Sequence, residues 1–270
     1  MMQHAVHRVG WIVLVVLAAW ATPGVRAAEP VMKRAHSHND YEQARPLQEA
    51  LDNEFGSIEA DIFLVEGELL VAHNRKDCTP ERTLEKLYLA PLAERAKAHG
   101  GHIYDGGGDV YLLIDIKDDA AATYAVLRKQ LEKHAAMLTR FTNAGAKPGA
   151  VTVILSGNRP IDLVKAEPER LCGIDGRLPD LEAGVSPTLM PWISDNWNVA
   201  FKWRGEGPMP EAEAAKLKAL VAKAHAAGHL LRFWGLPMRP DTVWPALFDA
   251  GVALLNADHL AQLREFLLSR

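Results

Sequence analysis

Two stretches of the chain decide its fold: residues 57–64 read SIEADIFL and residues 110–117 read VYLLIDIK. Both are short and apolar, and acidic residues interrupt them. Because successive side chains of a strand point to opposite faces, Glu59 and Asp61 share one face of the first stretch. Asp115 lies near the end of the second stretch, with apolar residues on both sides. Runs of this kind predict strands of a buried, mostly parallel sheet.

Six more apolar runs and six helical patterns alternate along the chain. We expect the other strands at residues 31–36, 150–156, 170–175, 188–194, 230–235 and 252–257. We expect helices at residues 46–54, 83–100, 121–134, 211–228, 241–251 and 259–268, with Gly100 and Gly228 as stops. Eight strands that alternate with helices predict a (β/α)8 TIM barrel. No linker divides residues 29–270, so we predict a single barrel domain there.

Two segments depart from the alternating pattern. Residues 179–210 are rich in Pro, Trp and Asn and connect strands irregularly. We expect this segment, which contains Trp192, Trp197 and Trp203, to shape the mouth of a pocket. The tryptophans themselves suit either a lipid interface or the core. The glycine-rich residues 100–109 (GGHIYDGGGD) lead into a strand rather than a helix. They therefore lack the context of a phosphate-binding loop and predict a flexible turn.

The first 27 residues have the pattern of a secretory signal peptide. A basic start is followed by the apolar run VGWIVLVVLAAWA and by small residues that suit a cut after Ala27 or Ala28. The apolar run is shorter than the roughly 20 residues that span a membrane. We therefore predict a cleaved leader and no stable membrane span. The mature protein is expected to be exported, either to the periplasm or into the medium.

The composition limits the partners of the chain. Its 270 residues suit one barrel, and 49% of them are apolar, enough for a large core. The net charge of −4 becomes −6 when Arg8 and Arg26 leave with the leader. A net-acidic protein does not attract nucleic acid, so we expect no nucleic-acid partner. Cys78 and Cys172 can pair in an oxidising compartment, but the sequence leaves their pairing open.

The acidic residues predict a metal site at the carboxyl ends of the strands, where TIM barrels carry their catalytic groups. On a buried face, Glu59 and Asp61 repel each other and lose hydration, and a cation relieves both problems. Asp115 can supply a third carboxylate. Hard cations prefer such oxygen ligands, so we predict one divalent cation, Mg²⁺ or Ca²⁺. Lys117, on the same face as Asp115, can neutralise a phosphate group.

Histidines follow two of these strands. The first strand ends in AHSHNDY, which places His36 and His38 two residues apart. After the second strand, residues 66–68 predict a tight turn, and LLVAH runs back to present His73. Imidazoles titrate near neutral pH and suit proton transfer in phosphodiester cleavage. We therefore predict His36 and His73 as an acid–base pair beside the acidic cluster.

Taken together, the run from AHSHND through GSIEADIFLVEGELLVAHN to YLLIDIK resembles the superfamily of glycerophosphodiester phosphodiesterases and phosphatidylinositol-specific phospholipases C. The resemblance implies a TIM barrel and metal-assisted phosphodiester cleavage. Matched motif by motif, it implies an acid–base role for His36 and His73 and a phosphate-side role for Lys117. It also implies that the metal ligands are Glu59, Asp61 and Asp115.

The resemblance continues more weakly into the second half of the chain. HLLRFWGLP (residues 229–237) resembles the seventh strand of the superfamily, where an aromatic residue lines the pocket, and GVALLNADHL (residues 251–260) resembles its eighth. The resemblance makes Trp234 a candidate pocket wall. Arg232 and Asp258 become candidate supporting residues.

The chain departs from the glycerophosphodiesterase pattern at its first strand. The usual His-Arg-Gly is replaced by His36-Ser37-His38, and the Pro-Glu-Asn-Thr motif is missing. We expect His38 and Asn39 to contact substrate in place of these groups. The third acid is Asp115 rather than Glu, as in the sphingomyelinase D branch from spider venom. The substrate class therefore stays broad: a small-molecule or lipid phosphodiester, cleaved by hydrolysis or by intramolecular transfer.

Two other functions compete with this hypothesis. An amidohydrolase or histidinol-phosphatase type of barrel would use His36 and His38 as a zinc pair, but it needs further histidines on its later strands. The fifth strand here offers Asp175, and the sixth offers no His. A non-catalytic binding barrel would explain the missing Arg. The retained histidines and acids argue against it.

Overall fold

The computed structural model describes residues 32–105 and 107–270. The predicted leader, residues 1–27, lies outside the described residues, so export stays a prediction. Within the described ranges, no helix has both the length and the apolar character needed to cross a bilayer.

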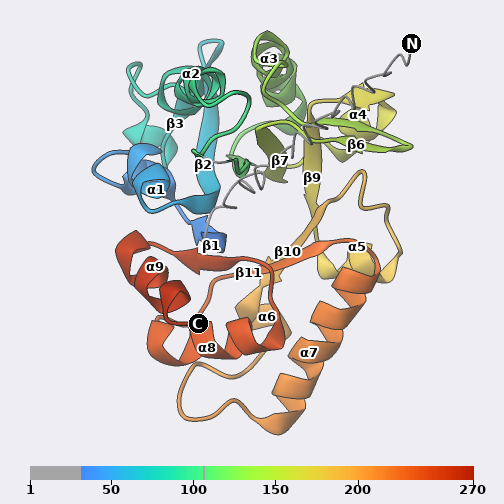
Figure 1. Cartoon of the computed structure of the whole chain (residues 1–270). Helices are drawn as coiled ribbons and strands as arrows, with labels where there is room; N and C mark the ends of the chain where they lie inside the picture. The colour runs from blue at the N-terminus through green and yellow to red at the C-terminus, as the bar shows by residue number, and fades with distance from the viewer. Residues whose placement is uncertain (1–31, 106) are drawn as a thin grey trace, which may run out of the picture.

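Eight strands form the predicted barrel (Figure 1). Around the barrel they follow the order β11-β10-β9-β7-β4-β2-β1-β12. Neighbouring strands along this path are parallel, and a parallel bridge between Arg232 and Leu254 joins its two ends. The strands are β1 (Met32–Ser37), β2 (Phe55–Val65), β4 (Val110–Ile116), β7 (Val151–Gly157), β9 (Cys172–Gly176), β10 (Trp192–Asn196), β11 (Leu230–Trp234) and β12 (Leu255–Ala257).

All eight predicted strands are confirmed, although β10 begins four residues later than the apolar run 188–194 suggests. The predicted helices are confirmed as well, and Gly100 and Gly228 take the left-handed conformation expected of helix stops. The α-helices are α1 (Gln48–Asp52), α2 (Ala90–Ala98), α3 (Ala120–Lys133), α4 (Ile161–Ala166), α5 (Leu178–Glu182), α6 (Trp197–Ala200), α7 (Glu211–Ala226), α8 (Pro240–Ala250) and α9 (Leu260–Leu268).

Shorter elements complete the chain. A 3₁₀ turn, η1 (Asp40–Glu42), follows β1, and another, η2 (Arg75–Asp77), follows β3. A π-helix, η3 (Glu85–Leu89), leads into α2. A small sheet that the sequence did not predict is made of β5 (Arg140–Thr142), β6 (Gly145–Lys147) and β8 (Glu169–Arg170).

A hairpin extends β2 beyond the barrel wall. Strand β3 (Glu68–Val71) runs antiparallel to the end of β2. Glu66 and Gly67, with φ of 50° and 85°, make the tight turn that the sequence predicts. The hairpin returns the chain to the mouth of the barrel, where it presents His73.

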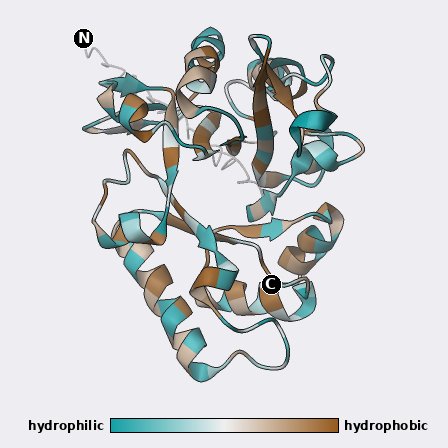
Figure 2. Ribbon diagram, turned by 180° about the vertical axis from the view of Figure 1, so that it is seen from behind, coloured by the Kyte–Doolittle hydropathy of each residue, from teal (hydrophilic) through white to brown (hydrophobic). Residues whose placement is uncertain are grey.

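Apolar side chains fill both sides of the barrel wall, and Figure 2 shows β2 as a mostly hydrophobic strand with a hydrophilic interruption. On the outer face, Ile58, Ala60 and Ile62 are fully buried in the main core cluster. A separate apolar cluster contains Leu113, Ile154, Trp192 and Leu254, which come from four different barrel strands or strand ends. It fills the barrel interior and forms a floor beneath the polar residues at the mouth.

The two cysteines do not pair. Both Cys78 and Cys172 are free thiols, and Cys172 is buried. Burial raises the pKa of Cys172 to about 12, so this thiol stays protonated.

Candidate active site

Three carboxylates converge at the mouth of the barrel. Glu59 and Asp61 lie on β2, and Asp61 is the register partner of Asp115 on the neighbouring strand β4. Each of the three offers an oxygen, and these oxygens lie within 4.8 Å of one another. The alternation of side chains along β2 places both of its acids on the inner face, and parallel pairing brings the third beside them.

The cluster fits a hard cation. Asp61 and Asp115 each have a buried Oδ1 atom without a hydrogen-bond partner. Burial, followed by the charge of Glu59, raises the pKa of Asp61 to about 6, and burial also raises the pKa of Asp115. Buried carboxylates without partners are costly, and a divalent cation would satisfy these oxygens. All three acids therefore suit the role of metal ligand.

Two basic side chains border the acids. The Lys117 ammonium lies 3.0 Å from Asp61 Oδ2 and 3.1 Å from Asp115 Oδ2. Burial lowers the pKa of Lys117, but the charges of both aspartates outweigh it and the net shift is upward. On the other side, Arg232 on β11 donates to Glu59 at 2.9 Å, and both side chains are almost fully buried. Although burial opposes it, this arginine holds the pKa of Glu59 well below its usual range.

His36 lies beneath the site rather than in it. It is fully buried, and its ring nitrogens lie 2.6 Å from Ser57 Oγ and 2.9 Å from Glu59 Oε2. Its ring also packs edge-on against Trp192. Burial, reinforced by the charge of Arg232, lowers the pKa of His36 to about 3, so the ring stays neutral. With both nitrogens engaged, it supports Glu59 and does not form the zinc pair with His38 that the competing amidohydrolase hypothesis would need.

His38 and His73 are the histidines that reach the cavity. His38 Nδ1 lies 2.7 Å from Asp258 Oδ1. Burial lowers the pKa of His38, but the hydrogen bond to Asp258 and the charges of Glu59 and Asp258 together outweigh it, so the net shift is upward. His73 Nδ1 lies 3.0 Å from the hydroxyl of Tyr41, and about half of the His73 side chain is exposed. The structure thus brings His38, not His36, opposite the same opening as His73.

Tyr41 ties the first loop to the acidic cluster. Its hydroxyl lies 2.7 Å from Asp61 Oδ2 and 2.9 Å from Asn39 Oδ1, and it is also the group next to His73. Asn39 adopts a left-handed conformation at φ 47° that turns the chain into η1. The hydroxyl has only one proton, which the oxygens of Asp61 and Asn39 share as acceptors. The hydroxyl oxygen can in turn accept from His73 when Nδ1 carries the proton.

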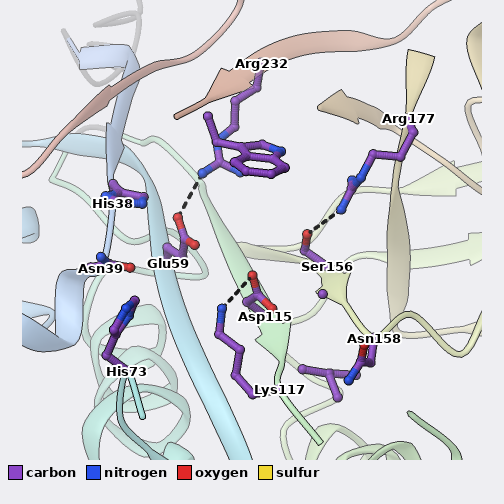
Figure 3. Close-up of a pocket in the computed structure, with 13 residues that line it drawn as sticks. His38, Asn39, Glu59, His73, Asp115, Lys117, Ser156, Asn158, Arg177 and Arg232 are labelled. Atoms are coloured by element: carbon purple, nitrogen blue, oxygen red, sulfur yellow. Dashed lines mark hydrogen bonds and ion pairs between the residues drawn. The ribbon is translucent and has the colours of Figure 1, made fainter. Parts of the chain in front are cut away.

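A cavity of about 490 Å³ opens over these groups (Figure 3). His38, Asn39 and His73 lie on one side of Asp115, while Ser156, Asn158 and Arg177 lie on the other. The full lining is His38, Asn39, Glu59, His73, Asp115, Ile116, Lys117, Ser156, Gly157, Asn158, Arg177, Arg232 and Trp234.

The tryptophans of the irregular segment do not shape this mouth. Trp192 and Trp197 are fully buried, Trp203 is nearly so, and none of the three lines the cavity. Trp192 fills the barrel floor, while Trp197 packs against Phe201 and Phe233 in the main core. No residue of 179–210 lines the cavity, and of the two uses that the sequence leaves open for these tryptophans, the structure shows the core. Trp234 does line the cavity and is 37% exposed.

Several lining residues escaped the sequence analysis. Ser156 and Gly157 end β7, Asn158 follows them, and Arg177 follows β9. A weak sign of their role exists, because each stands at the carboxyl end of a predicted barrel strand. Gly157 has a specific reason to be glycine: its φ is +67°, and an added Cβ would lie 2.0 Å from Asp115 Oδ1.

The fold and the site define a TIM barrel that carries an acidic cluster at the carboxyl ends of its strands. A solved structure supports the fold: a putative glycerophosphoryl diester phosphodiesterase from Silicibacter pomeroyi aligns with a TM-score of 0.54 over 91% of this chain and 96% of that chain, at 13% identity. A family model described as an AIM6-like phosphodiesterase domain matches residues 25–171. The chain belongs to this AIM6-like phosphodiesterase family.

Curated relatives agree with this assignment. The chain is 33% identical to an altered inheritance of mitochondria protein 6 homolog from Arthroderma benhamiae, over 83% of this chain and 80% of the relative. It is 30% identical to altered inheritance of mitochondria protein 6 from Eremothecium gossypii (88% of this chain, 70% of the relative) and from Saccharomyces cerevisiae (83% and 68%).

Proposed function

We propose that the chain is a divalent-cation-dependent phosphodiester hydrolase whose acid–base pair is His38 and His73. The observation that carries the proposal is the pair of buried, unpartnered carboxylate oxygens on Asp61 and Asp115, beside Lys117 at the floor of an open cavity. The phosphodiesterase family and the barrel fold support the same chemistry. The substrate is a small-molecule or lipid phosphodiester.

Glu59, Asp61 and Asp115 would hold the cation, which when bound offsets the charge that develops on the phosphoryl oxygens. Lys117 is partly exposed at the cavity and can bind a phosphoryl oxygen beside the acids. This arrangement gives the phosphorus a fixed position before any proton moves, which lowers the entropic cost of the reaction.

The two histidines can move protons on this frame. Asp258 orients the ring of His38 and favours its protonated form, so His38 is suited to donate a proton to the leaving oxygen. His73 is held by Tyr41 and open to solvent, so it is suited to accept a proton from the attacking hydroxyl or water. This proposal replaces the predicted His36 by His38, because His36 has no free nitrogen to offer substrate.

The test uses bis-p-nitrophenyl phosphate and a panel of glycerophosphodiesters, assayed with EDTA and after addition of Mg²⁺ or Ca²⁺. A Lewis-acidic cation supplies several kcal/mol of stabilisation, and each 1.4 kcal/mol is about tenfold in rate. We therefore expect EDTA, or the double substitution Glu59→Ala/Asp61→Ala, to lower kcat/KM at least about 100-fold. Metal content per chain, measured by plasma mass spectrometry, should fall in parallel.

A matched control is the double variant Glu66→Ala/Glu68→Ala, which removes two exposed acids at the same spacing from the hairpin turn. It should retain activity and metal. Full activity of the Glu59/Asp61 variant, or no turnover of any phosphodiester with either cation, would contradict the proposal.

A further inference from the structure

The wall of the cavity opposite the two histidines is polar and carries a guanidinium that the proposed chemistry does not use. Ser156, Asn158 and Arg177 form this wall, on the far side of Asp115 from His38 and His73 (Figure 3). The single negative charge of a phosphodiester already has Lys117 and a cation site facing it. Arg177 therefore faces a different part of any ligand that fills the cavity.

Arg177 is held in place by a buried acid. Asp175 is fully buried on β9 and accepts from Arg177 Nη1 at 2.8 Å and from Ser156 Oγ at 2.8 Å. The same Nη1 also reaches the backbone oxygens of Asp175 and Gly176. Arg159 donates to the Asp175 carbonyl at 2.7 Å and braces the strand end without lining the cavity. One edge of the Arg177 guanidinium is thus fixed by several contacts.

The other edge of the guanidinium remains available to a ligand. Nη2 has one long contact, 3.4 Å to Ser156 Oγ, and 23% of the side chain is exposed. A buried ion pair is weak grounds for stability, because desolvation offsets the attraction. A pair that orients a charged, donor-rich group toward a cavity is better explained by recognition. A guanidinium offers a planar fork of N–H donors that matches a carboxylate or phosphate.

The spacing of the strands sets the size of the group that can reach Arg177. Asp115 on β4 is the register partner of Ser156 on β7, and β7 pairs with β9. Parallel neighbours lie about 4.8 Å apart, so Arg177 follows a strand roughly 10 Å from the strand that carries Asp115. A spacer of about three carbons between phosphorus and a second anion bridges that gap, since an arginine side chain reaches inward.

We propose that Arg177 is a specificity-determining residue that binds an oxyanion, a carboxylate or phosphate monoester, on the alcohol portion of the phosphodiester substrate. The proposal rests on the proposed function, because it takes the carboxylate cluster as the seat of the phosphorus. It adds to that function a preference for doubly anionic substrates.

The experiment compares three p-nitrophenyl phosphodiesters whose second alcohol is butyl, 3-carboxypropyl or 3-phosphonooxypropyl. The wild type should show a higher kcat/KM for at least one of the two anionic esters than for the butyl ester, mainly through KM. Whichever anionic ester has the larger increase in kcat/KM over the butyl ester shows whether the site prefers a carboxylate or a phosphate. In Arg177→Gln the preference should fall at least about tenfold, as loss of a charge-assisted pair implies. Arg177→Lys, which keeps the charge but not the fork, should be intermediate.

Two further variants keep the result interpretable. Arg159→Gln removes an arginine that braces the same strand end, and it should retain the preference. Because Arg177→Gln leaves Asp175 without its charged partner, Asp175→Asn/Arg177→Gln removes both and should also lose the preference while folding. Equal kcat/KM for all three esters in the wild type, or an unchanged preference in both Arg177 variants, would overturn the inference.

Failure of the proposed function gives a different result. If the wild type cleaves none of the esters, calorimetric binding of the same compounds replaces turnover. Tighter binding of an anionic ester that disappears in Arg177→Gln supports the inference, and equal binding of all three refutes it.

Discussion

The two halves of the barrel are built differently. In the first half, β2 pairs with β4 from Ser57 to Ile62, and β4 pairs with β7 along its whole length. In the second half, β10 meets β9 at only two register pairs, β12 has three residues, and a single bridge joins β11 to the β12 end. The first half is a continuous, regular sheet, whereas the second is a set of short strands.

The chemistry divides along the same line. Glu59, Asp61, Asp115 and Lys117, the residues that would hold the cation and the phosphoryl group, all belong to the first half. The family model also matches this half, residues 25–171. The second half contributes Arg177, Arg232 and Asp258. The difference suggests that the regular sheet fixes the reaction centre, while the short strands adjust ligand binding and protonation.

Arg232 gives the strongest test of this division of roles, because it is a residue of the second half whose partner lies in the first half. It forms a nearly buried ion pair with Glu59 and takes part in the bridge that closes the barrel. We expect Arg232→Met to lower the free energy of unfolding by about 3–5 kcal/mol, because it leaves the buried carboxylate of Glu59 without its arginine partner. Urea denaturation followed by circular dichroism measures this effect.

The double variant Glu59→Gln/Arg232→Met removes both charges and should regain most of that stability. If the single and double variants are equally unstable, the loss comes from the side-chain volume of Arg232 and not from its charge.

Gly157→Ala tests whether the regular first half fixes the position of Asp115. An alanine Cβ would lie 2.0 Å from Asp115 Oδ1, and the φ of +67° is unfavourable for alanine. Strain of this kind costs about 1–3 kcal/mol, and the clash should displace the carboxylate of Asp115. We expect weaker cation binding and at least about tenfold lower activity, measured by calorimetric titration with Mg²⁺ or Ca²⁺ and by ester hydrolysis.

Gly184→Ala is the matched control. Gly184 has nearly the same φ, +69°, but nothing lies within 4 Å of an added Cβ. The Gly184→Ala variant should lose only the stability that an alanine costs at a positive φ, and it should bind the cation normally. Equal loss of cation binding in both variants would show that the contact with Asp115 is irrelevant.

The smallest expected effect is a shift in the pH dependence of activity when Asp258, a residue of the second half, is changed. The hydrogen bond to Asp258 is the main factor that raises the pKa of His38, while burial and Arg232 lower it and Glu59 raises it. A general acid works only while protonated, so activity is lost as pH rises through its pKa. Asp258→Asn removes the raising charge and should move the alkaline limb of kcat/KM to lower pH.

A second His–Asp pair serves as control for the pH profile. His99 Nδ1 lies 2.6 Å from Asp105, and neither residue lines the cavity. Asp105→Asn should leave the profile unchanged. An alkaline limb that stays in place in Asp258→Asn argues that another group is the acid.

The sequence predicted the barrel and its acids because both follow from periodicity. Two-residue alternation places Glu59 and Asp61 on one face, and parallel pairing then fixes the position of Asp115. The role of His36 could not be obtained this way. The register between β1 and β2 is irregular between Met32 and His36, and the turn at Asn39 takes His38 out of the sheet toward the cavity.

Other features depend on distant contacts that no local pattern records. Arg177 meets Ser156 across 21 residues, and Gly157 is needed because of Asp115, 42 positions earlier. By composition, the tryptophans of residues 179–210 suited an interface as well as the core, and Trp192 and Trp197 fill space inside the protein. A large ring with a polar nitrogen can serve either purpose, and only the surrounding packing decides.

The apolar floor around Trp192 has a kinetic consequence. Leu113, Ile154, Trp192 and Leu254 are almost fully buried, so they seal the barrel below the carboxylates and leave the mouth as the route to them. If the carboxylates hold a cation, cation and substrate would share this one entrance, and a bound substrate would cover the cation. Saturating substrate would slow inactivation by EDTA, and the delay would measure how long the mouth stays occupied.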